Sequence, residues 1–116
     1  MIRIEAIIPT TLLPEVMEAL RDLGCAGCTV TGVRTDILSN VDWTIYRGSV
    51  YRRHGSFAAA WRVDVVVSER RLEVALELLT RTIAAGTPGD GRILVAPVSG
   101  ATRIRTGESG EDAVAL

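Results

Sequence analysis

Apolar and polar residues alternate at the start of the chain and then give way to a continuous apolar stretch, within residues 2–8. This pattern predicts a strand that enters a buried sheet. Over residues 12–23 the apolar positions recur at helical spacing, which predicts an amphipathic helix with Thr11 as its N-cap and Pro14 in its first turn. Gly24 is expected to end this helix, because glycine tolerates the positive φ that the position requires.

The same two patterns return later in the chain. Residues 29–34 are rich in β-branched side chains and predict a second strand, and residues 58–67 alternate as a third strand would. Ser68 is the expected N-cap of a second helix, Gly86 its expected end, and residues 92–98 the expected fourth strand. The apolar face of this second helix consists of Leu72, Ala75, Leu76, Leu79 and Ile83.

A long stretch without periodicity, about residues 36–57, separates the second and third predicted strands. Loops of this length within a compact domain are uncommon and are usually functional or disordered. The order of the elements predicts an α+β fold, the ferredoxin-like βαββαβ arrangement, with both helices on one face of an antiparallel sheet. We expect a single domain over residues 1–116 and an oligomer that covers the other face of the sheet.

Charge and hydropathy argue against several classes of protein. The formal net charge of −1 gives nucleic acid no electrostatic attraction. No stretch approaches the length of a membrane span, and the N-terminus does not resemble a secretory signal, so we expect a cytoplasmic protein that is not itself a membrane protein. All 13 residues counted as Lys or Arg are arginines, which we attribute to the composition of the source genome. Each of these side chains is a planar fork that fits phosphate or carboxylate.

A glycine-rich segment and three arginines in the last third of the chain predict phosphate binding. Residues 86–91 contain three glycines, and Arg92 follows them at the start of the fourth predicted strand. Arg103 and Arg105 are two residues apart, so on an extended segment both side chains would point to the same side. Free backbone N–H groups and guanidinium forks together suit a polyphosphate. A plain turn is the alternative interpretation of the glycines.

Cys25 and Cys28 form a Cys-x-x-Cys motif. One pair is too few for a structural zinc site unless subunits share the metal, and it follows a helix where a thioredoxin-like motif would open one. We interpret the pair as two packed thiols, and a redox protein that uses them stays an alternative. The chain has one histidine, His54, in a basic loop, and its carboxylates are scattered, so we expect no enzyme.

Four segments resemble motifs of the PII signal-transduction proteins. Residues 4–8 read Ile-Glu-Ala-Ile-Ile, and residues 46–51 read Tyr-Arg-Gly-Ser-Val-Tyr where the family has Tyr-Arg-Gly-Ala-Glu-Tyr. Residues 89–92 read Gly-Asp-Gly-Arg, close to the family's Gly-Asp-Gly-Lys, and residues 103–108 read Arg-Ile-Arg-Thr-Gly-Glu, as the family pattern Arg-x-Arg-Thr-Gly-Glu does. The likeness covers nearly the whole chain and is interrupted only in the long loop, where this chain is longer.

The resemblance implies a homotrimer of ferredoxin-like subunits that binds an adenine nucleotide (ADP, ATP or AMP) in the clefts between neighbours. It also implies a signalling role, in which the long loop, called the T-loop in this family, controls an unidentified transporter or metabolic enzyme. The residues implied to surround the base and ribose are Ile7, Thr29, Asp64 and Val66. Those implied to bind the phosphates are Gly89, Asp90, Gly91, Arg92, Arg103 and Arg105. The candidate partner contacts in the T-loop are Trp43, Tyr46, Arg47, Tyr51, Arg52 and Arg53.

Alternatives to these roles stay open. The arginines have carboxylates that they could pair with across the trimer, namely Asp90, Glu108 and Glu111. Some family members are uridylylated at the position of Tyr51, but its neighbours here include Arg52 and Arg53, so we interpret it as a partner contact. A trimer that has kept the fold and lost its ligand is a further alternative.

The chain departs from the family pattern where the second effector binds. Residues 35–39 read Thr-Asp-Ile-Leu-Ser in place of Gly-x-Gly-Arg-Gln, so the glutamine that helps to hold Mg²⁺ and 2-oxoglutarate is missing, and Ala60 replaces a lysine that reaches the same ligand. The carboxylates of 2-oxoglutarate would have no charged partner at these two positions, and burying an unpaired carboxylate is energetically costly. We therefore expect a small anion, bicarbonate, in its place, as in the carboxysome-associated branch of PII-like proteins. A conventional nitrogen-regulatory PII protein that senses ATP, ADP and 2-oxoglutarate is the alternative, and the role of Mg²⁺ stays open.

Overall fold

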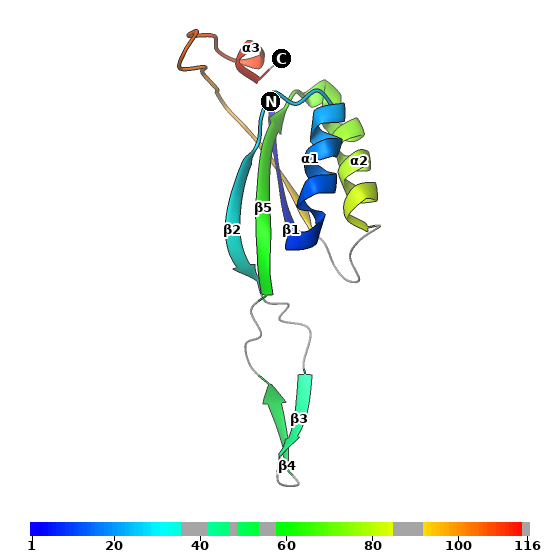
Figure 1. Cartoon of the computed structure of the whole chain (residues 1–116). Helices are drawn as coiled ribbons and strands as arrows, with labels where there is room; N and C mark the ends of the chain where they lie inside the picture. Colours follow the sequence, from blue (N-terminus) through cyan, green and yellow to red (C-terminus); the bar gives the residue numbers. More distant parts are fainter. Residues whose placement is uncertain (36–41, 47–48, 54–57, 85–91, 115–116) are drawn as a thin grey trace.

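The computed structural model describes residues 1–35, 42–46, 49–53, 58–84 and 92–114, with the backbone alone for residues 42–46 and 49–53. Four antiparallel strands form the main sheet in the order β2-β5-β1-β6. Their bounds are β1 Ile2–Pro9, β2 Thr29–Thr35, β5 Ala58–Val67 and β6 Ile93–Pro97. Two helices, α1 (Leu13–Asp22) and α2 (Leu72–Ala84), lie side by side on one face of this sheet (Figure 1). The predicted ferredoxin-like α+β fold is confirmed.

The core lies between the sheet and the two helices. On β1 the buried residues are every second one from Ile4 to Ile8, and on β5 they are Val63, Val65 and Val67. The helices contribute Val16, Leu20, Ala75, Leu79 and Ile83 to the same cluster. The strands bury every second residue, and the helices bury residues at a spacing of about 3.6. The sequence patterns predict both spacings.

The helix ends agree with the sequence analysis only in part. The C-terminus of α1 is as predicted: Gly24 has a φ of 75°, its N–H donates to the Arg21 carbonyl, and the Cys25 N–H donates to the Leu20 carbonyl. This is a Schellman motif. The predicted N-cap is wrong, because a 3₁₀ turn, Thr10–Leu12, precedes α1 and places Leu12 at the cap. Pro14 does lie in the first turn of α1.

A similar 3₁₀ turn, Glu69–Arg71, precedes α2. Ser68 caps that turn, not α2 itself, and its side chain makes no capping hydrogen bond. The predicted end of α2, Gly86, lies outside the described residues, of which Ala84 is the last in this helix.

The long segment between β2 and β5 contains a hairpin that periodicity did not reveal. Strands β3 (Asp42–Tyr46) and β4 (Ser49–Arg53) pair antiparallel with each other, in a two-stranded sheet separate from the main one. Figure 1 shows this hairpin beyond the ends of β2 and β5. Among the described residues, neither β3 nor β4 pairs with a strand of the four-stranded sheet.

The chain after β6 folds back on itself and ends in a short helix, α3 (Glu111–Val114). An isolated bridge joins Thr102 and Ser109, and the Gly110 N–H donates to the Ala101 carbonyl at 3.0 Å. We call residues 101–110 the C-terminal loop. Among the described residues, no helix is long and apolar enough to cross a membrane.

Candidate functional site

The face of the sheet opposite the helices carries a small charged cluster. The Arg62 Nε lies 3.2 Å from the Asp64 Oδ2, to which it donates a hydrogen bond, and 3.7 Å from the Glu5 Oε1. Glu5 and Asp64 are direct cross-strand neighbours on β1 and β5, so their side chains emerge together. The Asp64 side chain is 17% exposed, and its second oxygen, Oδ1, is buried without a hydrogen-bond partner among the described residues. An acceptor in this state can receive an N–H or O–H group from a ligand.

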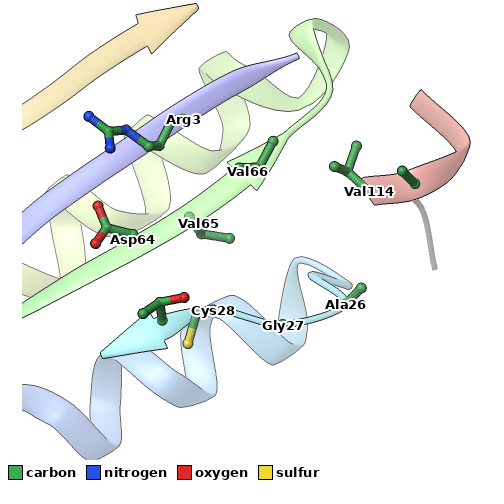
Figure 2. A pocket seen from close by; sticks show the side chains of 10 residues that line it. Arg3, Ala26, Gly27, Cys28, Asp64, Val65, Val66 and Val114 are labelled. Carbon is green, nitrogen blue, oxygen red and sulfur yellow. The ribbon is translucent and has the colours of Figure 1, made fainter. Parts of the chain in front are cut away.

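Asp64 lines a pocket of about 480 Å³ at one end of the sheet (Figure 2). Strands β1, β2 and β5, the turn before β2 and helix α3 all contribute to it. This volume lies within the usual range for a small-molecule site. The lining residues are Arg3, Ala26, Gly27, Cys28, Thr29, Asp64, Val65, Val66, Ala113 and Val114.

Three of the residues implied to hold the base and ribose line this pocket, namely Thr29, Asp64 and Val66. They come together because Thr29 on β2 is the cross-strand partner of Asp64, and Val66 lies two positions further on the same face of β5. The fourth, Ile7, lies on β1 opposite Arg62 and is not part of the lining.

The arginines implied to bind phosphate do not line the pocket of their own chain. Arg92 is exposed just before β6, and Arg105 is exposed in the C-terminal loop. Gly89, Asp90 and Gly91 lie outside the described residues, so their predicted role has no structural counterpart to compare.

Arg103 lies on the C-terminal loop with its backbone held at both ends. Its N–H donates to the Glu108 carbonyl, and its own carbonyl accepts from the Gly107 N–H, both at 2.8 Å. Residues 104–106 form a turn, so the expectation that Arg103 and Arg105 share one side of an extended segment is wrong. The Arg103 Nε donates to the Ala113 carbonyl of α3 at 3.0 Å. Between the two arginines, Ile104 is fully exposed at 101%.

The lining also includes Arg3, Ala26 and Gly27, which the sequence analysis missed, and Cys28, which it treated only as part of the Cys-x-x-Cys motif. As pocket residues, all four have no sequence signal other than their position. Arg3 is a polar residue on the alternating strand β1, and residues 26–28 directly precede Thr29. Ala113 and Val114 carry no such signal, because nothing local to them indicates that the end of the chain returns to the start of β2.

Cys25 and Cys28 flank the turn before β2, and both are free thiols. Cys28 lines the pocket, and its Sγ–H donates to the Met17 Sδ at 3.6 Å. Burial raises the pKa of both thiols above the ordinary 9.0, and nearby Arg71 and Arg21 offset this only partly, for Cys25 and Cys28 respectively. No group of three or more metal-ligating side chains occurs within the described parts of the chain. A raised pKa disfavours the thiolate that fast redox chemistry needs.

Both cysteines should therefore react slowly with iodoacetamide at neutral pH, with rates that rise only above about pH 9. The thiols of the unfolded chain ionise at a lower pH than the folded ones. Above 9.0 the unfolded state thus binds fewer protons, and the free energy of unfolding should fall until the folded pKa values are passed. Mass spectrometry of the alkylated protein measures the rates. Reaction at pH 7 as fast as that of free cysteine would contradict the expectation, and the double variant C25S/C28S is the control for the unfolding measurement.

The candidate partner contacts Trp43 and Tyr46 belong to β3, and Tyr51, Arg52 and Arg53 belong to β4. The structure gives their backbone and register only, with Thr44 opposite Tyr51 and Trp43 opposite Arg52. Arg47 lies outside the described residues.

Comparison with known proteins identifies the family. Residues 1–108 match the family model described as "Nitrogen regulatory protein P-II". Proteins of that name from Cereibacter sphaeroides, Azospirillum brasilense and Pasteurella multocida are 40%, 39% and 38% identical to this chain, respectively. Each alignment covers 97% of this chain and 98% of the relative. The chain therefore belongs to the nitrogen regulatory P-II family of signalling proteins, as its resemblance to PII motifs indicated.

Proposed function

We propose that this P-II protein is a cytoplasmic sensor that binds an adenine nucleotide, ADP, ATP or AMP, at the pocket described above. One observation carries the proposal: Thr29, Asp64 and Val66, nominated from the sequence for the base and ribose, gather around one pocket of suitable volume. The Asp64 Oδ1 supports it further, because a buried acceptor that has no partner among the described residues matches the exocyclic amine of adenine.

The phosphates are proposed to lie between subunits of a homotrimer. The pocket of one chain is not lined by its own Arg92, Arg103 or Arg105. If two subunits share the site, these arginines can come from the neighbouring subunit. Guanidinium groups supplied from a neighbouring subunit would bind phosphate oxygens bidentately. Native mass spectrometry checks the assembly, for which the expected mass is about three times 12.5 kDa.

The second effector is proposed to be bicarbonate, with the T-loop as the segment that binds or releases a transporter or metabolic enzyme. Ala60 supports this choice, because its buried methyl group, 6% exposed, offers no charge to a dicarboxylate. The names of the relatives favour a second candidate, a nitrogen-regulatory protein. In that candidate 2-oxoglutarate would take the place of bicarbonate as the second effector. In either case the nucleotide controls the loop only if its affinity differs between two loop conformations.

Calorimetric titration with ADP and ATP tests the proposal, with each titration repeated in bicarbonate and in 2-oxoglutarate plus Mg²⁺. Nucleotide binding whose affinity changes only with bicarbonate is the expected result. Tighter ATP binding with 2-oxoglutarate would support the nitrogen sensor. Failure to bind any adenine nucleotide would contradict both candidates and leave a trimer without this ligand.

Asp64→Ala should weaken ADP binding by about 1.5 kcal/mol, the lower end of the range for hydrogen bonds to charged groups. Glu5→Ala is a matched control, because Glu5 shares Arg62 with Asp64 but does not line the pocket. Both variants remove one carboxylate from the charged cluster, and only Asp64→Ala removes an acceptor from the pocket. Equal affinities in the two variants, measured by calorimetry, would rule out a contact between Asp64 and the base.

A further inference from the structure

Helix α3 closes one side of the pocket. Ala113 and Val114 belong to its lining, and Figure 2 shows Val114 on α3 across from Val66 on β5. The remainder of the lining comes from the main sheet and the turn before β2. The position of this four-residue helix therefore determines how open the pocket is.

The Arg103 side chain connects α3 to the C-terminal loop, in addition to the backbone. The Arg103 Nε donates to the Ala113 carbonyl at 3.0 Å, in the same short helix that lines the pocket. The loop that carries Arg103 is itself well held, by the Thr102–Ser109 bridge and the hydrogen bond from the Gly110 N–H to the Ala101 carbonyl. Arg103 thus links a fixed loop to α3.

The same guanidinium is the one that the proposed function assigns to a phosphate. A peptide carbonyl is a neutral acceptor that occupies one N–H of the fork, whereas a phosphate is charged and binds two. The guanidinium is a charged donor in both contacts, but only the phosphate brings an opposite charge and accepts two N–H groups in parallel. A phosphate within reach therefore competes successfully with the Ala113 carbonyl for Arg103.

We propose that α3 is a latch on the pocket, which Arg103 holds closed in the unliganded chain and which the nucleotide phosphate releases by taking Arg103 from the Ala113 carbonyl. This proposal rests on the proposed nucleotide site and adds its regulation. It requires only that Arg103 binds phosphate, whichever subunit's pocket holds the base. The position of α3 then depends on whether nucleotide is bound. The closed position of α3 lowers the affinity for nucleotide, because the contact between Arg103 and Ala113 must break before the phosphate binds.

Nuclear magnetic resonance on the full-length ¹⁵N,¹³C-labelled protein tests the latch. Without ligand, the Arg103 Nε–H signal should show nuclear Overhauser contacts to α3, and saturating ADP should abolish them. The amide signals of Thr29 and Val66 report binding independently. If neither amide shifts with ADP, the proposed function is wrong; if both shift while the contacts between Arg103 and α3 persist, the latch is wrong.

Adenosine is the ligand control, because it has the base and ribose but no phosphate. At a concentration that saturates the Thr29 shift, it should leave the contacts between Arg103 and α3 in place. Loss of these contacts with adenosine would show that the base alone displaces α3, which would overturn the exchange at Arg103.

The matched variants are Arg103→Gln and Arg105→Gln, both measured without ligand. Arg103→Gln removes the donor to α3 and should increase the fast motion of the Ala113 and Val114 amides in ¹⁵N relaxation. Arg105→Gln should leave it unchanged, because no hydrogen bond or ion pair joins the Arg105 side chain to another described residue. Unchanged core amides, such as that of Val65, confirm that each variant is folded. Equal motion of α3 in both variants would overturn the latch.

Discussion

Replacing Leu79 with alanine should lower the free energy of unfolding by about 2–5 kcal/mol, the range for large-to-small substitutions in a closed core. Leu79 is 2% exposed and belongs to the buried cluster that joins α2 to β1 and α1, which includes Ile8 and Val16. Its removal takes apolar atoms out of the core and leaves a cavity that its neighbours can only partly fill. Urea unfolding at fixed protein concentration and without nucleotide measures the loss, because ligand and assembly both raise apparent stability.

Val74→Ala on the same helix is the matched control for Leu79→Ala. Val74 is 58% exposed, so its truncation should change stability by no more than about 0.5 kcal/mol. Equal losses in the two variants would contradict the assignment of Leu79 to the core. Both substitutions keep or improve helix propensity, so that propensity does not explain a loss.

Arg103→Ala should weaken ADP binding by about 1.5–3 kcal/mol, or roughly 10- to 150-fold, if the guanidinium binds phosphate. Arg92→Ala is expected to act in the same direction for the same reason. Truncation of Arg103 also removes the donor to Ala113, which by itself would ease binding. The net effect stays a loss, because a charge-assisted bidentate contact outweighs one hydrogen bond to a carbonyl.

Arg81→Ala is the control for these two substitutions. Arg81 is 71% exposed on α2, its ion pair with Glu77 is a surface pair at 4.0 Å, and neither residue lines the pocket. Its loss should leave ADP affinity unchanged in calorimetry. Wild-type affinity in both the Arg92 and the Arg103 variant would refute the phosphate assignment, even if ADP itself binds.

Local patterns predicted most of the main sheet and helices. The alternation in β1 and β5 and the helical spacing in α1 and α2 each reflect which side of one element is buried, and Gly24 reflects the positive φ of one turn. The hairpin of β3 and β4 was missed, because its strands pair with each other outside the main sheet and no core-facing alternation marks them. The N-cap of α1 was misplaced by one residue, from Leu12 to Thr11, because Thr11 has the side chain typical of an N-cap and the preceding 3₁₀ turn has no sequence signal of its own.

Part of the candidate site could likewise be predicted from the sequence, and the rest could not. The motifs indicated the family, and the resemblance to it nominated Thr29, Asp64 and Val66, which the structure places around one pocket. Three features followed only from the folded chain: the charged cluster around Arg62, the Asp64 Oδ1 without a partner among the described residues, and the return of α3 to the turn before β2. Each depends on contacts between residues far apart in sequence, which the register of β5 against β1 and β2 and the path of the C-terminal loop determine. Local residue patterns indicate the periodicity of an element and the conformation of a turn. They do not indicate how far apart two such elements lie in the folded chain.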